Sequence, residues 1–536
     1  MSSTMMRRGR LVLAIIVGLY LLLFGFTSLT YTRSFTSDSM NYVDVAGNLL
    51  AGRGLVQSTL GFNTPDFSPA TPIPAPFTTQ PPLYPASIAL LSVTGVSGAD
   101  AALLVAVLAY GLVLLFSYLL ARILYDEPVA MLVVAALLFY KPLAFVADHA
   151  WSETLAVALA LLSLWLLVLV MRGRLSLFAG ALLSGLAGGL AFATRYSFAV
   201  IVVLAVASTG MAALVSRDRK HKTEKFVTGT LYVAGFLLVA GPVLLHNWVT
   251  TRALLPSYNP ATTGLVENTG RALETLFGGY AEVGEVLHRE VALAVCLAAL
   301  AALVLLRQRA ASGGWLKKTF FQRGRYLLIG WSIAYTALVV YQRSIHHFDE
   351  LDARLLVPAG VALVMLIVAF TVRALNLSSR VAVTVAIVVA VAAVGQQSAR
   401  VWVHANRGAV PQRPLPAHLE WLARNTTDED LIVSKDAVDV PFWLGRSGAV
   451  SYSPYPYTVH LQHSKVQELA MHKCADYRRL FLVASVTNPD EQRNRLDYGP
   501  YITDLASGRY EPYPGLVLKA QLKGTAIYEV ECRPPG

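Results

Sequence analysis

Charged residues and cysteines are both scarce in this chain. Only 14% of its 536 residues are charged, whereas a soluble domain has about a quarter. Three cysteines are too few for a disulfide scaffold or a four-cysteine zinc site. The glycine patterns of P-loop and Rossmann nucleotide sites are also missing from the sequence. These absences argue against a soluble nucleotide-binding protein.

Apolar residues take the place of the missing charge. Hydrophobic residues make up 55% of the chain, and the mean hydropathy is +0.53. Runs of about 20 apolar residues predict transmembrane helices. We expect a polytopic α-helical membrane protein with about eleven such helices, at residues 11–30, 101–121, 128–146, 152–171, 176–193, 197–215, 226–246, 290–306, 326–342, 354–372 and 381–397.

The net charge of +11 predicts the orientation of these helices. Basic residues collect in four short connections, at 171–174, 216–225, 307–325 and 373–380. All four share the cytoplasmic side with the basic N-terminus if the short apolar segment 83–98 lies along the membrane without crossing it. We therefore expect a multi-pass protein of the inner (plasma) membrane with its N-terminus cytoplasmic and its C-terminus outside. The same distribution disfavours nucleic acid as a partner.

Residues 401–536 have a different composition from the transmembrane domain expected over residues 1–400. A helix is predicted at 415–425, and short β-branched runs predict strands at 430–435, 478–485, 515–522 and 525–531. The sequence therefore predicts a small extracytoplasmic α+β domain. Cys474 and Cys532 lie in it, as a disulfide pair or as two separate buried thiols.

The first outer loop, residues 31–100, contains the first candidate for chemistry. Asp38 follows the first span within Asp38-Ser39-Met40-Asn41-Tyr42. A carboxylate held at the membrane surface can act as a general base or bind a metal. The alternative is that Asp38 only caps the helix that follows it.

Three cations are candidates for binding an anion. Lys141 lies within a predicted span, where a charge costs about 2.5–3.5 kcal/mol, so a functional role is the first hypothesis and snorkelling to the interface is the alternative. Arg195 and Arg354 lie near the outer ends of other spans. Arg195 can instead anchor two helices at the interface, and Arg354 can simply pair with Asp349 or Asp352.

Asp148, His149 and Glu153 cluster in sequence where two predicted spans meet outside the membrane. Glu153 can bind a sugar hydroxyl, support the site or coordinate a metal together with Asp38. The alternative is an acid that interacts favourably with a helix N-terminus.

Four stretches, in this order, resemble one family. They are Asp38-x-x-x-Tyr42-x-x-x-Ala46-x-Asn48-Leu49-Leu50-x-Gly52-x-Gly54, Pro81-Pro82-Leu83-Tyr84-Pro85, Trp151-Ser152-Glu153-Thr154-Leu155 and Asp352-Ala353-Arg354-Leu355-Leu356-Val357-Pro358. The chain is similar to the GT-C superfamily of membrane glycosyltransferases over residues 5–400. The most similar branch is protein-mannosyltransferase-like and includes aminoarabinose and galacturonosyltransferases.

The resemblance implies a GT-C-like fold and a cell-envelope enzyme. Such an enzyme moves a sugar from a polyprenyl-phosphate carrier to a lipid, glycan or protein acceptor on the outer face of the membrane. The family's essential acid corresponds to Asp38, and segment 83–98 would be its juxtamembrane helix. The family often has Glu after this Asp, where this chain has Ser39.

The implied chemistry assigns roles to the other candidates. Glu153 would join Asp38 in catalysis. The departing phosphate would bind Lys141, Arg195 and Arg354, with support from Tyr42, Asp148 and His149. One base that deprotonates the acceptor favours inversion at the sugar. No resident cofactor is implied, and a divalent metal remains an open alternative.

The alternative from another functional class is a transporter or flippase of lipid-linked glycans. Transporters are often built from repeated halves with broken helices near the bilayer midplane. No such repeat is visible in this sequence, and its polar residues favour one membrane surface. We therefore favour the enzyme.

Overall fold

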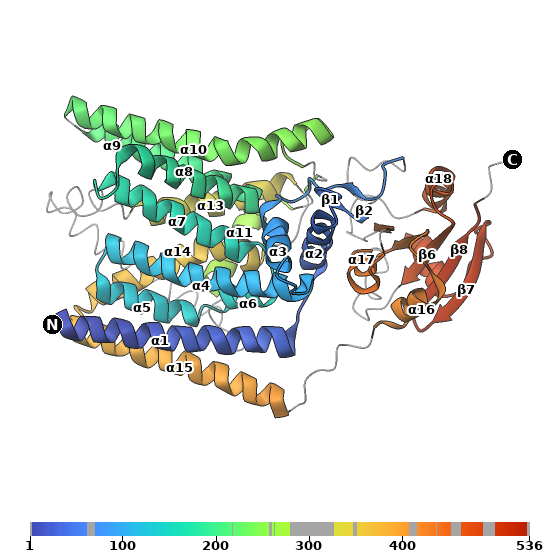
Figure 1. Ribbon diagram of the computed structural model, residues 1–536, viewed down its shortest axis with the longest axis horizontal. Coiled ribbons are helices and arrows are strands. Elements are labelled where there is room, and N and C mark those ends of the chain that lie inside the picture. Colours follow the sequence, from blue (N-terminus) through green and yellow to red (C-terminus); the bar gives the residue numbers. More distant parts are fainter. Residues whose placement is uncertain are drawn as a thin grey trace.

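The computed structural model describes residues 3–61, 70–216, 218–256, 260–261, 263–278, 326–346, 351–406, 415–435, 437–446, 448–451, 462–485 and 499–532. A bundle of long helices makes up most of the chain, and a small sheet domain lies beyond one end of it (Figure 1). We call that end of the bundle the domain end. The predicted span 290–306 and the basic segment 307–325 lie outside the described residues.

Eight helical segments of the described chain are long and apolar enough to cross a membrane. They contain α1 (Ser3–Thr27) with the π-helical turn η1 (Ser28–Thr32), α4 (Gly98–Leu124), α7 (Glu153–Met171), α8 (Leu177–Thr194), η2 (Tyr196–Ala199) with α9 (Val200–Val215), α10 (Arg219–Thr251), α14 (Ala353–Ala374) and α15 (Ser379–Asn406). The protein is therefore a multi-pass membrane protein. The predicted span 326–342 lies in helix α13 (Tyr326–Ile345), which is not among these eight.

One further apolar segment of the described chain forms two helices that meet at a bend. Helices α5 (Glu127–Leu138) and α6 (Lys141–Asp148) meet at an angle of 57°, where the sequence predicts one span at 128–146. Pro142 has no N–H to donate to the Leu138 carbonyl, which a continuous helix would require. The Tyr20 hydroxyl donates to that carbonyl instead, at 3.3 Å, so the break is compensated.

Residues 31–100, which the sequence predicts to be the first outer loop, form two helices between the bundle and the sheet domain (Figure 1). They are α2 (Ser37–Leu50) and α3 (Leu83–Ser92), whose rings Tyr42 and Tyr84 are both buried and lie 4.9 Å apart. The ten residues of α3 extend about 15 Å, half the thickness of a bilayer core. This short apolar helix is the predicted juxtamembrane segment.

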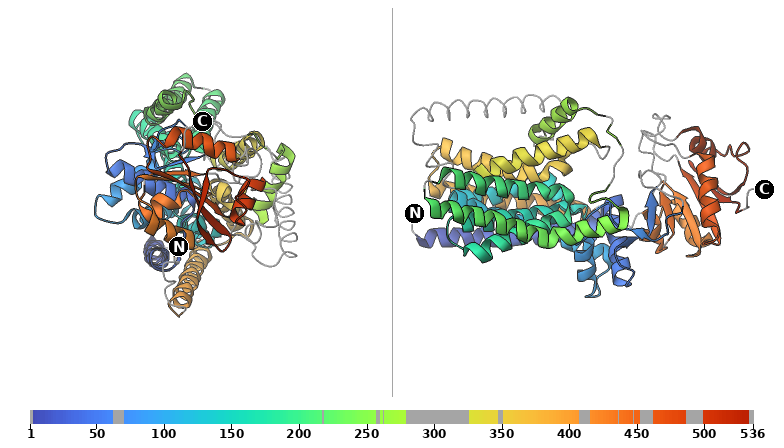
Figure 2. Two further views of the ribbon diagram at one scale, coloured as in Figure 1. Left: turned by 90° about the vertical axis from the view of Figure 1, so that its right-hand side faces the viewer. Right: turned by 90° about the horizontal axis from the view of Figure 1, so that it is seen from above.

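The sheet domain has six strands in the order β2-β5-β4-β6-β8-β7. The strands are β2 (Thr59–Gly61), β4 (Asp430–Ser434), β5 (Ala449–Ser451), β6 (Arg479–Ser485), β7 (Leu516–Leu522) and β8 (Thr525–Val530). Helices α16 (Ala417–Asn425), α17 (Asp439–Leu444), α18 (His463–Lys473) and α20 (Gly499–Ala506) belong to the same region. The domain is α+β, and Figure 2 shows it from two further directions.

The first outer loop takes part in this sheet. Strand β2 pairs in parallel with β5, and a further two-stranded ribbon joins β1 (Val56–Gln57) to β3 (Ala75–Pro76). The Lys473 ammonium donates to the Thr71 carbonyl, which adds a second connection to the loop. The boundary predicted after residue 400 therefore differs from the structure in two ways, because α15 continues to Asn406 and residues 59–61 join the later sheet.

Cys474 and Cys532 form a disulfide in the structure, with their Cα atoms 5.6 Å apart. It links the end of α18 to the segment after β8.

Candidate active site

The beginning of α2 determines where Asp38 points. Thr36 is the N-cap, and its backbone N–H donates to the Ser39 hydroxyl at 2.7 Å. Capping is therefore provided by Thr36 and Ser39, and the alternative that Asp38 serves only as a cap is wrong. Ser39, where the family often has Glu, therefore has a structural role in capping α2.

Asp38 is instead one of four charged side chains that meet at the domain end. Arg354, at the start of α14, donates through Nη2 to Asp38 Oδ2 and through Nε to Glu153 Oε1 at 2.6 Å. Arg195 Nη1 lies 2.8 Å from the same Glu153 oxygen. We call Asp38, Glu153, Arg195 and Arg354 the charge cluster. Its two positive and two negative charges balance.

The sequence allowed Asp352 as an ion-pair partner of Arg354, but Asp352 has a different role. Its carboxylate caps α14 by accepting from the Leu355 backbone N–H at 3.1 Å. The Arg354 side chain turns toward α2 and α7. Asp349, the other partner considered, lies outside the described residues.

The four side chains differ in their exposure. Glu153 is 0% exposed and Arg354 9%, whereas Arg195 is 20% and Asp38 27% exposed. Among the two acids of the cluster, Asp38 alone can therefore be reached by a bound substrate without a rearrangement. Glu153 is buried behind the two arginines and bonds both of them, so it influences the site through their positions.

Burial would raise the pKa of Asp38, but its neighbours outweigh this effect. The charge and hydrogen bond of Arg354 lower the pKa, as do the charge of Arg195 and a hydrogen bond from Gln80 Nε2 to Asp38 Oδ1 at 3.1 Å. The net result is a lowered pKa. Asp38 is therefore ionised at neutral pH.

The segment between α6 and α7 supports the cluster from one side. The Arg354 guanidinium lies over the Trp151 ring at 3.9 Å, and the indole N–H donates to the Thr36 hydroxyl at 2.6 Å. The neighbouring Ser152 hydroxyl accepts from Tyr42 at 3.0 Å. Trp151 and Ser152 thus fix α2 against the start of α7.

The remaining predicted site residues lie elsewhere. Lys141, Asp148 and His149 line a different cavity, between α1, α6 and α15, and no member of the charge cluster lines it. The structure therefore brings together Asp38, Glu153, Arg195 and Arg354, and it does not bring Lys141 to the two arginines.

One known protein family matches a part of the chain that contributes to this site. Residues 79–246 match the family model of dolichyl-phosphate-mannose-protein mannosyltransferases, a stretch that contains Gln80, Trp151, Glu153 and Arg195. No curated protein sequence matches the chain.

The fold itself matches solved membrane glycosyltransferases. ArnT from Cupriavidus metallidurans bound to undecaprenyl phosphate gives a TM-score of 0.57 at 14% identity, over 98% of this chain and 99% of that one. The Archaeoglobus fulgidus oligosaccharyltransferase AglB, in complex with an inhibitory peptide and a dolichol-phosphate, gives 0.51 at 12% identity, over 98% and 74%. The arabinofuranosyltransferase AftD from mycobacteria gives 0.51 at 16% identity, over 97% and 41%.

The chain therefore has the fold of these solved membrane glycosyltransferases. The motifs that resemble the family contain Asp38, Glu153 and Arg354, and the structure brings these residues together in the charge cluster. Other contributors to this site were not predicted as site residues. Gln80 and Trp151 contact the cluster directly, and Thr36 bonds to Trp151. The signals that point to these three residues are the motifs that contain or adjoin them.

The charge cluster offers no matching ligand set for the metal considered from the sequence. Asp38 and Glu153 both accept from Arg354, and the described part of the chain has no group of three or more His, Cys, Asp or Glu side chains that could hold an ion. We assign no catalytic step to a metal.

Proposed function

We propose that this protein transfers a sugar from a polyprenyl-phosphate carrier to a lipid, glycan or protein acceptor, with Asp38 as the general base. One observation carries the assignment to Asp38: it is the more exposed of the two acids of the charge cluster, bonded to Arg354 at the domain end. Two of the similar structures have undecaprenyl phosphate and dolichol-phosphate bound, which supports a carrier of this chemical class.

The reaction needs little acid assistance. The acceptor oxygen or nitrogen attacks the anomeric carbon, and the bond from that carbon to the phosphate oxygen breaks with its electron pair on the phosphate. Because the leaving group is already a stable anion, the remaining proton transfer is from the acceptor to Asp38. A positioned base contributes about 10²- to 10⁴-fold to such a step.

Arg354 and Arg195 are the proposed ligands of the donor phosphate. In the structure they neutralise Asp38 and Glu153, and arginine binds phosphate by paired charge-assisted hydrogen bonds. A donor phosphate would therefore compete with Asp38 for the Arg354 guanidinium. Weakening the bond from Arg354 raises the pKa of Asp38, so donor binding makes this carboxylate a better base.

The burial of Glu153 favours inversion of the sugar. A retaining mechanism requires a second carboxylate in contact with the anomeric carbon. Glu153 is 0% exposed and bonds both arginines. We therefore propose Glu153 as a positioning residue and a single displacement by the acceptor.

We propose that the domain end faces the outside of the inner membrane. The N-terminus and the sheet domain lie at opposite ends of the bundle (Figure 1). Arg7, Arg8 and Arg10 begin α1, and basic residues near an N-terminus stay on the cytoplasmic side. The disulfide of Cys474 and Cys532 supports an oxidising compartment for the sheet domain.

The test is purified full-length protein in lipid nanodiscs, supplied with a sugar-loaded polyprenyl phosphate and a membrane extract as the acceptor source. An enzyme releases polyprenyl phosphate and adds one sugar mass to an acceptor, and Asp38→Asn abolishes both products while still binding the carrier. Carrier movement between leaflets without any released polyprenyl phosphate would favour the flippase and overturn the proposal.

A further inference from the structure

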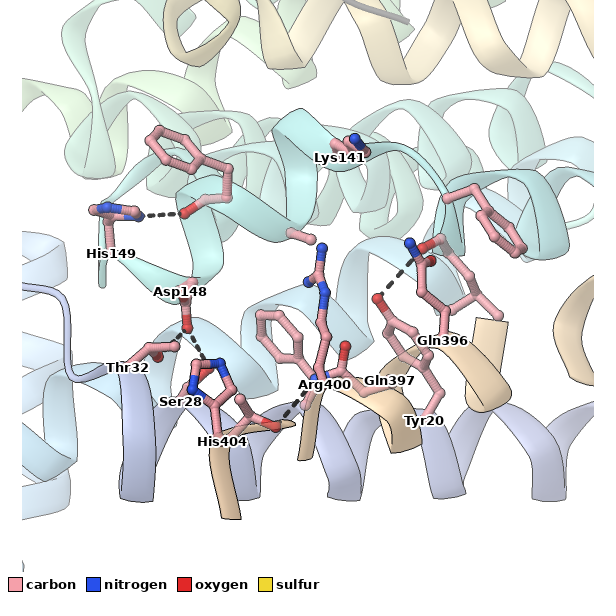
Figure 3. Close-up of a pocket in the computed structure, with 16 residues that line it drawn as sticks. Tyr20, Ser28, Thr32, Lys141, Asp148, His149, Gln396, Gln397, Arg400 and His404 are labelled. Atoms are coloured by element: carbon pink, nitrogen blue, oxygen red, sulfur yellow. Dashed lines mark hydrogen bonds between the residues drawn. The ribbon is translucent and has the colours of Figure 1, made fainter. Parts of the chain in front are cut away.

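A second cavity, of about 420 Å³, lies between α1, α6 and α15 (Figure 3). Its polar lining includes Lys141 from α6 and Arg400 and His404 from α15. The charge cluster contributes no residue to it. The glycosyl transfer described above therefore leaves this cavity without a function.

Two permanent cations are placed on opposite walls of this cavity. Arg400 extends from α15 into the space that faces α6, and Lys141 lies at the start of α6 (Figure 3). Both residues are exposed on the surface of the chain. Charged side chains within membrane-spanning segments are costly and as a rule functional, and two of them around one cavity suit an anionic ligand.

His404 extends the polar lining along α15. It lies four residues after Arg400, which places both side chains on one face of the helix. Its ring stacks on Tyr31 with the ring centres 5.6 Å apart. The imidazole is thus held at the cavity wall, where it can donate a hydrogen bond to an anion.

The acid of this cavity is engaged with α1. Asp148 Oδ1 accepts from the Ser28 hydroxyl at 2.6 Å and from the Thr32 hydroxyl at 2.7 Å. Two short hydrogen bonds hold the carboxylate at the end of the first span (Figure 3). The negative charge in the lining therefore sits at its edge, against the η1 turn.

The part of the cavity next to the break between α5 and α6 has apolar and polar side chains. Tyr20 and Phe24 line it from α1, with their rings 6.3 Å apart, and Leu138 and Phe139 line it at the break. Gln396 and Gln397 line it from α15 (Figure 3). Tyr20 lies twelve residues before Thr32, or about 18 Å along the helix. Cations at one end and apolar side chains at the other match the amphipathic form of a lipid.

We propose that this cavity binds the phosphate headgroup of a membrane lipid, with Lys141 and Arg400 as the cations that hold it. A phosphate monoester is the chemistry that two cations on facing walls recognise. The lipid can be a polyprenyl phosphate or a phosphoglyceride, and the test separates these two sources. The proposal does not rest on the proposed catalytic reaction.

The cavity is connected to the active site through one aromatic wall. The His149 and Trp151 rings have their centres 5.0 Å apart, and the Trp151 ring also contacts the Arg354 guanidinium at 3.9 Å. A lipid at this site would thus be separated from the charge cluster by the segment from His149 to Ser152.

The experiment is native mass spectrometry of the full-length protein titrated with phosphatidic acid, with undecaprenyl phosphate, and with diacylglycerol as the lipid that lacks phosphate. We expect phosphatidic acid to bind and diacylglycerol not to. Lys141→Met combined with Arg400→Met should weaken the binding of the phosphate lipid about tenfold or more, since each hydrogen bond from a charged group is strong. Arg380→Met, at the other end of α15, is the matched control and should leave binding unchanged.

Three outcomes overturn the proposal. Equal binding of phosphatidic acid and diacylglycerol would show that phosphate is not recognised. Full binding in the folded double variant, verified by an unchanged melting temperature, would exclude these two cations. Loss of phosphatidic acid in Arg195→Gln, with retention in the double variant, would place the lipid at the charge cluster.

The lipid source is read from the same titrations. For the binding that the double variant loses, tighter binding of undecaprenyl phosphate than of phosphatidic acid identifies a carrier site, and equal binding of both lipids identifies a general phosphate headgroup site. Inorganic phosphate is the last ligand to be tested. It should compete only weakly with the phosphate lipids because it lacks a hydrocarbon tail. Competition at equal concentration would indicate a soluble ligand and contradict the lipid.

Discussion

Arg354 and Asp38 are 316 positions apart in sequence and form an ion pair in the structure. The pair joins α14, late in the bundle, to α2 of the first outer loop. Because the same guanidinium also bonds Glu153, one side chain holds both acids of the charge cluster. The following predictions test what this arrangement does.

Asp38→Asn should remove the base without changing the shape of the site. We expect kcat to fall about 10²- to 10⁴-fold, with carrier binding retained because Arg195 and Arg354 remain. Steady-state kinetics with sugar-loaded polyprenyl phosphate measures both quantities. Asp100→Asn is the control, since Asp100 is an exposed acid at the start of α4 that pairs with Arg33. Unchanged kcat in Asp38→Asn would contradict the assignment.

Glu153→Gln should destabilise the bundle. Removing one partner of a buried ion pair leaves an uncompensated charge and costs about 3–5 kcal/mol, and here two arginines lose their shared partner. Thermal unfolding in detergent should show a clearly lower midpoint. Adding Arg195→Gln to this variant should restore part of the loss, because the charges balance again. A midpoint equal to wild type would show that the cluster does not contribute to stability.

The pH dependence follows from the lowered pKa of Asp38. A carboxyl whose pKa is lowered by folding stabilises the protein at pH values above its ordinary pKa of about 3.9. This stabilisation is lost as the pH falls through the lowered pKa. We therefore expect kcat/KM to keep its full value down to about pH 4. Gln80→Leu removes one of the bonds that lower the pKa and should move the acid limb upward. An acid limb well above pH 4 in the wild type would contradict this account.

The disulfide should stabilise the sheet domain. Cys474 and Cys532 are 58 positions apart, and closing a loop of that size contributes about 2–5 kcal/mol. Cys474→Ser should make the region after α15 more sensitive to limited proteolysis while the bundle remains intact. Cys296→Ser replaces the third cysteine of the chain and serves as the control. Equal protease resistance in both variants would show that the bond does not contribute.

Much of the bundle could be predicted from the sequence because the bilayer fixes the length of an apolar helix. The segment 83–98 was predicted not to cross, and α3 spans only Leu83–Ser92. The break between α5 and α6 could not be predicted from hydropathy, because the two helices together are apolar enough for one span and the bend depends on Pro142 and on a bond from Tyr20.

Strands of the sheet domain were also visible in the sequence. The β-branched runs near 430–435 and 478–485 coincide with β4 and β6. Strand β2 was not visible, because three residues such as Thr59–Gly61 have no periodicity of their own. Only pairing with β5 makes them a strand.

The charge cluster could be predicted in its members but not in its connections. Asp38, Glu153 and Arg354 stood out because they lie in motifs that resemble the family, and Arg195 because it is a cation near the predicted outer end of a span. Which acid bonds which arginine depends on how the helices pack. The same limitation applies to Lys141, which a bent helix directs to another cavity.

The pairing of β2 with β5 sets an order of events during synthesis. Thr59 pairs with Ala449, so the first outer loop cannot complete its fold until most of the chain has been made. At about 5–20 residues per second, the ribosome needs tens of seconds to cover that distance. The helix that carries Asp38 is therefore among the first segments to leave the ribosome, whereas strand β2 of the same loop finds its partner only when the final domain is being made.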